Sequence, residues 1–305
     1  MRTNRMTQLA FGIGTLAALA ALSAPAPAQQ QQQAPPPIKV TKVKDNIYFV
    51  QGGAGSNNGF IVGKNGVIVV DTKITPASEK DVLAEIAKVT PSPVTAAIIT
   101  HSDADHVNGL AALPTSVTVI AQENCKAEMV ASASTRNPAP QDHLPSKTYA
   151  KTDKLTIDGV HVRLYHWAPA HTSGDTIAYF PDQKVVFGGD LLTNMPNAPN
   201  PLIHLEKHGS AEGWIENVKG MLALNADTYL TGHGDLLTKA DVQKKLDFVQ
   251  DKYNKIKTMA AMGKSLDEIK TSLGESTAPP QPNANGQLPA PTFTEVIYKE
   301  VTAKS

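Results

Sequence analysis

Four side chains that can bind a metal ion lie within six consecutive residues. They are His101, Asp103, Asp105 and His106, directly after the apolar, β-branched stretch Val94–Thr100. This density is too high for a loop that only connects two elements. Because the run offers imidazole and carboxylate but no thiolate, it suits zinc, iron or manganese better than copper or calcium. We therefore predict a cation site at the end of this strand.

Three later segments also end in potential ligands. His171 lies in Ala170-His171-Thr172-Ser173-Gly174-Asp175, Asp190 follows Gly189, and His233 follows Gly232. Each segment follows an expected strand, and its glycine and small polar residues allow loop backbones to approach closely. Ligands at the ends of strands on a rigid sheet are what a preorganised metal site requires. We expect the four segments to converge.

Taken in order, these motifs resemble those of the metallo-β-lactamase-fold hydrolases. The family pattern is H-x-H-x-D-H, then a histidine in Gly/Ala-His-Thr-x-Gly-Asp, an aspartate after glycine, and Gly-His near the end. The resemblance covers about residues 40–260, and Asp71 matches the family's early strand-end aspartate. It implies an α/β fold, a four-layer αβ/βα sandwich of two mixed β-sheets flanked by helices.

The resemblance also implies two divalent metal ions, with zinc as the first choice. Metal one would take His101, Asp103 and His171, metal two would take Asp105, His106 and His233, and Asp190 would bridge them. Asp105 would in addition be catalytic, because it would orient the attacking water or accept its proton. Asp71 and Asp175 would hold the ligands in position.

Asp103 departs from the pattern, since most members have a histidine at this position. The additional negative charge would make metal one a weaker Lewis acid and shift the preference toward iron or manganese. The flavodiiron branch has a glutamate here, but its flavodoxin domain has no counterpart in this sequence. In having an aspartate at the bridging position, Asp190, the chain resembles glyoxalase II, lactonases and phosphodiesterases. The usual β-lactamases have cysteine or serine at the matching position.

These features predict a hydrolase that cleaves an ester, lactone or thioester in a small-molecule substrate. Three alternatives stay open: a metallo-β-lactamase, a di-iron redox or oxygen-binding protein, and a non-catalytic binding protein. The 28 basic residues balance the 28 acidic ones, so no overall charge attracts nucleic acid. The sequence indicates neither the substrate-binding residues nor the oligomeric state.

The N-terminal segment has the pattern of a Sec-type signal peptide. A positive start with Arg2 and Arg5 precedes the apolar run Leu9–Leu22 and the cleavage motif Ala26-Pro27-Ala28. We predict a signal peptide over 1–28, a Gln/Pro-rich tether over 29–37, the metallo-β-lactamase-fold domain over 38–274, and a Pro-rich linker with a C-terminal segment over 275–305. The mature protein would be periplasmic or secreted, without stable membrane insertion. Cys125 is the only cysteine and is expected to be a small buried residue.

Hydrophobic periodicity gives an alternating α/β pattern. Antiparallel strands joined by hairpins are expected over Val40–Val50 and Phe60–Val70, with the turns 52–59 and 64–66 between and within them. Further strands are expected at Val94–Thr100, Val117–Ala121, Lys154–Ile157, Val160–Trp167, Ile177–Phe180, Lys184–Phe187 and Thr228–Leu230. Helices are expected at Ser78–Val89, Val107–Leu113, Glu123–Ser132, Ala211–Leu224, Lys239–Met262, Ser265–Leu273 and Phe293–Val301. The loops 53–59, 134–145 and 194–208 would form the pocket walls. The remaining histidines considered, His143, His161, His204 and His208, are interpreted as ordinary polar side chains, although His204 could reach a substrate.

Overall fold

The first sheet is built by the N-terminal half of the chain. The computed structural model describes residues 34–283, 286 and 288–303, so the predicted signal peptide lies outside the described residues. The sheet comprises β1 (Lys39–Lys44), β2 (Ile47–Gln51), β3 (Asn58–Val62), β4 (Val67–Val70), β5 (Val94–Ile98), β6 (Thr118–Gln122) and β7 (Lys147–Tyr149), in that order. Strands β1 to β4 pair antiparallel and β4 to β7 pair parallel. This sheet is therefore mixed, as predicted.

The second sheet is built by the following strands. It comprises β8 (Thr152–Ile157), β9 (Val160–Tyr165), β10 (Ile177–Phe180), β11 (Val185–Phe187), β13 (Thr228–Leu230) and β15 (Leu237–Thr238), in the order β15-β13-β11-β10-β9-β8. Only β11 and β13 pair parallel, and the other pairs are antiparallel. A short parallel pair of β12 (Thr193–Asn194) and β14 (His233–Gly234) lies outside both sheets.

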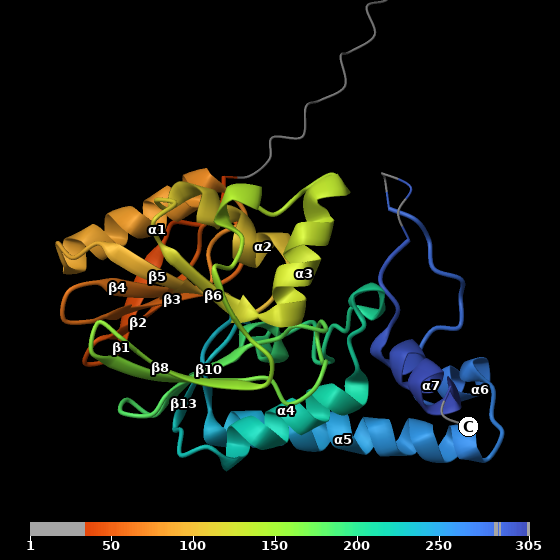
Figure 1. The fold of residues 1–305 in the computed structure, drawn as a ribbon. Coiled ribbons are helices and arrows are strands. Elements are labelled where there is room, and N and C mark those ends of the chain that lie inside the picture. Colours follow the sequence, from red (N-terminus) through yellow and green to blue (C-terminus); the bar gives the residue numbers. More distant parts are fainter. Residues whose placement is uncertain (1–33, 284–285, 287, 304–305) are drawn as a thin grey trace, which may run out of the picture. The chain divides into compact units, whose positions relative to one another are not determined.

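Helices flank the two sheets on their outer faces, and α6 and α7 lie beside α5 at one end (Figure 1). Those of the first half are α1 (Pro76–Val89), α2 (Ala104–Val107) and α3 (Glu123–Ala131). Those of the second half are α4 (Ala211–Ala223), α5 (Lys239–Ala261), α6 (Leu266–Ser272) and α7 (Phe293–Ala303). Serine or threonine caps start α5 and α6, where Thr238 with Asp241 and Ser265 with Glu268 form capping boxes.

Three hydrophobic clusters follow from the alternation of side chains along each strand. Ile61, Ile98 and Phe180 belong to the cluster between the two sheets. Neighbouring residues such as Phe60 and Ala97 point the other way, toward α1 and α3. Tyr229 of the second sheet packs outward toward α4 and α5. This arrangement is the predicted four-layer sandwich.

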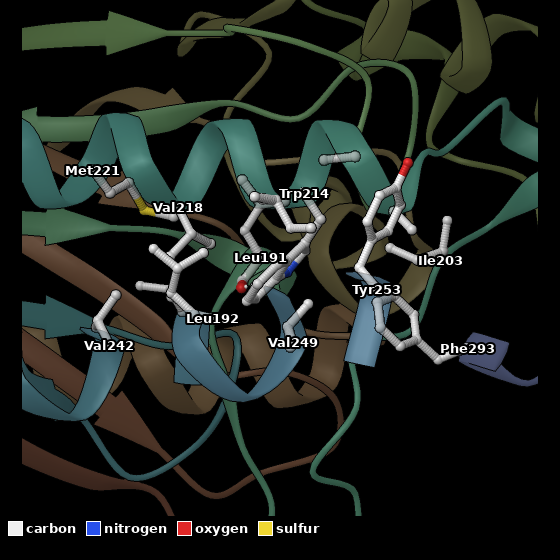
Figure 2. Packing of buried hydrophobic residues seen from close by; sticks show 14 of the residues in the cluster. Leu191, Leu192, Ile203, Trp214, Val218, Met221, Val242, Val249, Tyr253 and Phe293 are labelled. Atoms are coloured by element: carbon white, nitrogen blue, oxygen red, sulfur yellow. Dashed lines mark hydrogen bonds between the residues drawn. The ribbon is translucent and has the colours of Figure 1, made fainter. Parts of the chain in front are cut away.

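The hydrophobic cluster between the second sheet and helices α4 and α5 also packs against the segment that follows β11. Figure 2 shows Trp214 of α4 beside Leu191, Leu192 and Val249. The indole nitrogen of Trp214 donates to the carbonyl oxygen of Leu191 at 3.0 Å. Phe293 of α7 lies against Tyr253 of α5 in the same cluster (Figure 2). Among the described residues, no helix has the length and apolar character needed to cross a membrane.

Some local expectations were wrong. The stretch Val40–Val50 is two strands, because Asp45 and Asn46 form a turn between β1 and β2. The expected helix Val107–Leu113 is instead the end of α2 followed by a 3₁₀ helix at Asn108–Ala112. Strand β7 and the two-residue strands β12, β14 and β15 were not expected. They are too short to produce a hydrophobic period.

Candidate metal centre

Four loops bring the predicted ligands together. The run from His101 to His106 leaves β5 and enters α2, and His171 lies in the loop between β9 and β10. Asp190 lies in a 3₁₀ helix after β11, and His233 follows β13. Because β11 and β13 are parallel neighbours, their carboxyl ends deliver Asp190 and His233 to one edge of the second sheet.

The first group consists of His101, Asp103 and His171, whose ligand atoms all lie within 4.8 Å of one another. Oδ2 of Asp103 lies 3.5 Å from Nε2 of His101 and 3.2 Å from Nε2 of His171. Both histidines are buried, and Asp103 is partly exposed. This is the set predicted for metal one.

The second group consists of Asp105, His106 and His233, again with ligand atoms within 4.8 Å. Oδ2 of Asp105 lies 3.2 Å from Nε2 of His233 and 3.8 Å from Nε2 of His106. Asp105 and His233 are partly exposed, so this group faces the solvent side. It is the set predicted for metal two.

Asp190 lies between the two groups. Its Oδ1 is 3.3 Å from Nε2 of His106, and its Oδ2 is 3.9 Å from Nε2 of His171 and 3.5 Å from Nε2 of His233. The carboxylate therefore contacts His171 of the first group and both histidines of the second. Its ligand atom also lies within 4.8 Å of those of His101 and His106. That position suits a bridging ligand.

The chemistry of the cluster fits a cation. Among the described residues, Nε2 of His101, Nε2 of His106 and Oδ1 of Asp190 are buried and make no hydrogen bond. Buried polar atoms without partners are costly and uncommon in native proteins. Imidazole nitrogens and carboxylate oxygens that face one another in this way are the donor set that zinc and related ions use.

Asp71 holds the first motif in position. Its Oδ2 lies 2.8 Å from Nδ1 of His106, and its Oδ1 accepts from the amide of Thr100 at 2.7 Å. The hydroxyl of Thr100 in turn lies 3.0 Å from Nδ1 of His101. Asp71 has a φ of 58°, a left-handed conformation that aspartate tolerates better than most residues. Fixing the Nδ1 side of an imidazole directs its Nε2 toward a metal.

Asp175 supports the loop that carries His171. It is buried and accepts hydrogen bonds from the amide of Thr172 at 3.0 Å and from the Thr172 hydroxyl at 2.9 Å. Nδ1 of His171 contacts the carbonyl oxygen of Leu202 at 2.8 Å. Asp175 thus touches the loop backbone and not the ligand group.

Gly232 allows the last loop to approach Asp190. A Cβ atom at this position would lie 1.9 Å from Oδ1 of Asp190, which is far inside van der Waals contact. The glycine before His233 is therefore required by the packing of the site.

The charges in the site are strongly coupled. Burial alone would lower the pKa of His106, but the carboxylates of Asp190 and Asp71 raise it well above the ordinary value. Burial likewise opposes the charge on His171, yet the hydrogen bond to Asp103 raises its pKa to about 9. For Asp190, burial favours the neutral form, but His106 keeps the pKa of the carboxyl well below its usual range. A metal ion must therefore displace protons from the imidazoles when it binds.

Two basic residues beside Asp103 were not identified from the sequence. Nε2 of His204 lies 3.1 Å from Oδ2 of Asp103, and Nζ of Lys207 contacts Oδ1 of Asp103 and the hydroxyl of Ser102. The interpretation of His204 as an ordinary polar side chain was therefore incomplete. The sequence feature that could have indicated such partners is Asp103 itself, because an additional carboxylate in a buried site requires a positive partner. Lys207 offsets the charge on which the expected preference for iron or manganese depended.

Two of the other histidines, His143 and His161, make contacts outside the cluster, whereas His208 lines a cavity together with Ser102 and Lys207. Nε2 of His143 contacts the carbonyl oxygen of Leu113 at 2.9 Å, and Nδ1 of His161 contacts Asp182 at 2.8 Å on the surface. Cys125 is buried, as predicted, and burial raises the pKa of its thiol well above the ordinary value.

A cavity of about 500 Å³ opens beside the first group. Its lining includes Ser102, Glu128, Ser173 and Lys207, and Glu128 accepts a hydrogen bond from Ser173 at 2.6 Å. The loop 53–59 lies over the second group, where the hydroxyl of Ser56 donates to the carbonyl oxygen of Asp105 at 2.8 Å. A cavity lined by α3 and loop residues thus lies on one side of the ligand cluster, and the loop 53–59 lies on the other.

The sequence profile of the metallo-beta-lactamase superfamily matches residues 52–233. This range is more than half of the chain and contains every proposed ligand, and the chain belongs to this superfamily. The predicted family and fold are confirmed.

Two characterised relatives are similar over part of the chain. The 2,4-dinitroanisole O-demethylase subunit alpha of Nocardioides sp. (strain JS1661) is 28% identical over 57% of this chain and 51% of its own length. The linear primary-alkylsulfatase of Pseudomonas sp. (strain ATCC 19151) is 25% identical over 67% of this chain and 47% of its own length. The chain thus spans about half the length of these relatives.

Among solved structures, the sec-alkylsulfatase Pisa1 from Pseudomonas sp. superposes with a TM-score of 0.68 at 16% sequence identity. The superposition covers 86% of this chain and 50% of that chain. At this identity the similarity establishes the fold alone.

Proposed function

We propose that this protein is an exported, metal-dependent hydrolase that cleaves an ester, lactone or thioester in a small molecule at a binuclear metal site. The main support is the convergence of two ligand groups on either side of Asp190, with buried nitrogen and oxygen atoms that make no hydrogen bond within the described residues. The superfamily consists mainly of hydrolases, which agrees with this proposal.

The chain's own residues have distinct roles in the proposed reaction. His101, Asp103 and His171 would hold one ion, Asp105, His106 and His233 the other, and Asp190 would contact both. When bound, such ions lower the pKa of a water molecule and polarise the bond to be cleaved.

Asp105 is the residue best suited to handle the proton of the attacking water. It is partly exposed, whereas Asp190 is nearly buried, so Asp105 is the more accessible of the two carboxylates to solvent water. His233, 3.2 Å away, and His106 keep the pKa of Asp105 below the ordinary value against the effect of burial, so the carboxylate is ionised and can accept a hydrogen bond.

Within the ester class, we favour sulfate or carboxylic esters over lactams. The names of the two relatives describe an alkylsulfatase and an O-demethylase, both of which act at a bond to oxygen. Asp190 also occupies the position at which the usual β-lactamases have cysteine or serine.

A substrate panel tests this proposal. Protein loaded with zinc, manganese or iron is assayed against carboxylic esters, sulfate esters, lactones, thioesters and a chromogenic cephalosporin. We expect at least one ester, lactone or thioester to be hydrolysed at a rate tenfold or more above that of the cephalosporin. Asp105→Asn should lower the rate with that substrate by about 10²-fold or more. Asp182→Asn, at a surface histidine pair, is the matched control.

Other outcomes of the panel would change the assignment. A cephalosporin rate that equals the best ester rate would make the protein a β-lactamase. Absence of turnover with all three metals would favour a binding protein, and bound iron with visible absorbance would favour a redox protein.

Export is a separate part of the proposal and depends on residues 1–28, which lie outside the described residues. Cell fractionation with N-terminal sequencing tests it. A mature chain that begins at Gln29 outside the cytoplasm is expected, and an intact Met1 on cytoplasmic protein would contradict it.

A further inference from the structure

His204 approaches the first ligand group from a segment that the family motifs do not include. It precedes the 3₁₀ helix Leu205–Lys207, and its amide donates to the carbonyl oxygen of His171 at 2.9 Å. Its ring lies edge-on to the ring of His171, with centroids 4.8 Å apart. The backbone hydrogen bond therefore fixes His204 beside a proposed ligand.

The side chain of His204 is oriented in the same way as the proposed ligands. Its Nδ1 contacts the carboxylate of Glu206, as Nδ1 of His106 contacts Asp71 and Nδ1 of His171 contacts a carbonyl oxygen. In each case the outer nitrogen has a protein acceptor and Nε2 points inward. Metal-binding histidines typically have this arrangement, because the outer hydrogen bond fixes the tautomer.

Three imidazole nitrogens surround one oxygen of Asp103. Oδ2 lies 3.5 Å from Nε2 of His101, 3.2 Å from that of His171 and 3.1 Å from that of His204. In a tetrahedral zinc site with bonds of about 2.0–2.1 Å, ligand atoms are about 3.3 Å apart. The three separations from Asp103 are close to this value. Among the described residues, His204 belongs to no group whose ligand atoms all lie within 4.8 Å of one another. Its ring, which is 19% exposed, would therefore have to turn to share an ion with His101 and His171.

The other oxygen of Asp103 is paired with Lys207, which comes from the same segment as His204. The Asp103–Lys207 pair is neutral overall, like the imidazole that the family pattern has at position 103. What the site then lacks, relative to the pattern, is one nitrogen ligand. His204 is the histidine placed to supply it.

We propose that His204 is a ligand of metal one and replaces the imidazole that Asp103 displaces from the family motif. The inference rests on the proposed binuclear metal site. It assigns to the loop 201–208 a part in metal binding that the motif alone does not contain.

Cobalt titration tests the proposal. Wild type, His204→Ala, His204→Gln and the surface control His161→Ala are titrated with Co²⁺, and the metal content, the dissociation constants from chelator competition and the visible d–d bands are measured. We expect His204→Ala and His204→Gln to lose about 100-fold in affinity at one of two sites with a change in its d–d bands, and His161→Ala to match the wild type. The glutamine variant is informative because its amide can still donate to Asp103.

A rescue variant distinguishes a role of His204 as a metal ligand from a role as a hydrogen-bond partner of Asp103. Asp103→His restores the family motif, so the double variant Asp103→His with His204→Ala should bind two ions with affinities near those of the wild type. If His204→Ala does not fold, His204→Gln and the imidazole ¹⁵N shifts of the intact wild type during titration still test the proposal.

The results that would overturn the inference are distinct. Unchanged affinity and d–d bands in His204→Ala, or an unshifted His204 Nε2 resonance on metal binding, would show that His204 only hydrogen-bonds to Asp103. If the wild type binds two ions and hydrolyses its substrate in that case, the proposed function stands and only this inference fails. A wild type that binds no cation would refute both.

Discussion

Nδ1 of His106 lies 2.8 Å from Oδ2 of Asp71, and both side chains are buried. The pair joins the end of β4 to the first turn of α2, so the aspartate orients a proposed ligand 35 residues away. A second His–Asp pair with the same 2.8 Å separation, His161 with Asp182, lies on the surface.

These two pairs give a controlled test of ligand orientation. We expect Asp71→Asn to lower metal affinity or activity by about 10–100-fold, because the amide cannot hold the imidazole in the same protonation state. Asparagine tolerates the left-handed backbone at position 71, so the fold should be retained. Asp182→Asn should leave both quantities unchanged. Equal effects of the two substitutions, measured by chelator competition, would contradict the role given to Asp71.

His233→Ala should remove one of the two ions. The first group does not include His233, whereas the second group has only Asp105 and His106 without it. Elemental analysis of dialysed protein should give about two ions per chain for the wild type and about one for the variant. Retention of both ions would mean that His233 is not a ligand.

Glu79→Gln should change the dependence of stability on pH. Burial raises the pKa of Glu79 from 4.5 to about 8, so the folded protein keeps a proton that the unfolded chain releases. The free energy of unfolding of the wild type should therefore fall, relative to that of the variant, as the pH rises from about 4.5 to about 8. Burial lowers the pKa of Lys73 to about 8, so its titration changes the free energy of unfolding only above this pH window. The free energies of unfolding are measured by urea denaturation at several pH values in this window. The same pH dependence for wild type and Glu79→Gln would refute the role given to Glu79.

Trp214 supports the segment that carries Asp190. Trp214→Ala should lower the free energy of unfolding by about 3–5 kcal/mol, since the side chain is fully buried. Trp214→Phe keeps most of the packing but leaves the carbonyl oxygen of Leu191 without its donor, which costs about 1–3 kcal/mol. Phe248, which is 47% exposed, provides the control, and its alanine variant should change stability by about 0.5 kcal/mol or less. Thermal unfolding with a cobalt titration would measure both stability and metal binding.

The C-terminal helix α7 should be needed for stability. Phe293, Val296 and Ile297 are buried in the same cluster as α4 and α5. Phe293→Ala should cost about 3–5 kcal/mol, whereas Leu288→Ala, at a position 65% exposed, should be near neutral. A chain truncated after Gly274 that unfolds at the same temperature as the full chain would show that the fold ends where the sequence alone suggests.

The sequence by itself determined the ligand types and the strands that carry them. His101 to His106 follow directly after a buried strand, and the Gly-rich turns before Asp190 and His233 are encoded within a few residues. Strand alternation and turn chemistry are local properties, so the strands and the positions of the candidate ligands at their ends could be predicted. The four-layer fold and the division of the ligands between two ions were implied by the resemblance of the motifs to the metallo-β-lactamase-fold hydrolases.

The partners of Asp103 were decided only by the tertiary structure. His204 and Lys207 lie more than 100 residues further along the chain, in a loop with no periodic pattern. Their contacts depend on the path of that loop after Asp190 and on its hydrogen bond to the backbone of His171. Long-range pairing of this kind leaves no signal in residue spacing, because it is fixed by how two separate loops pack and not by either loop alone.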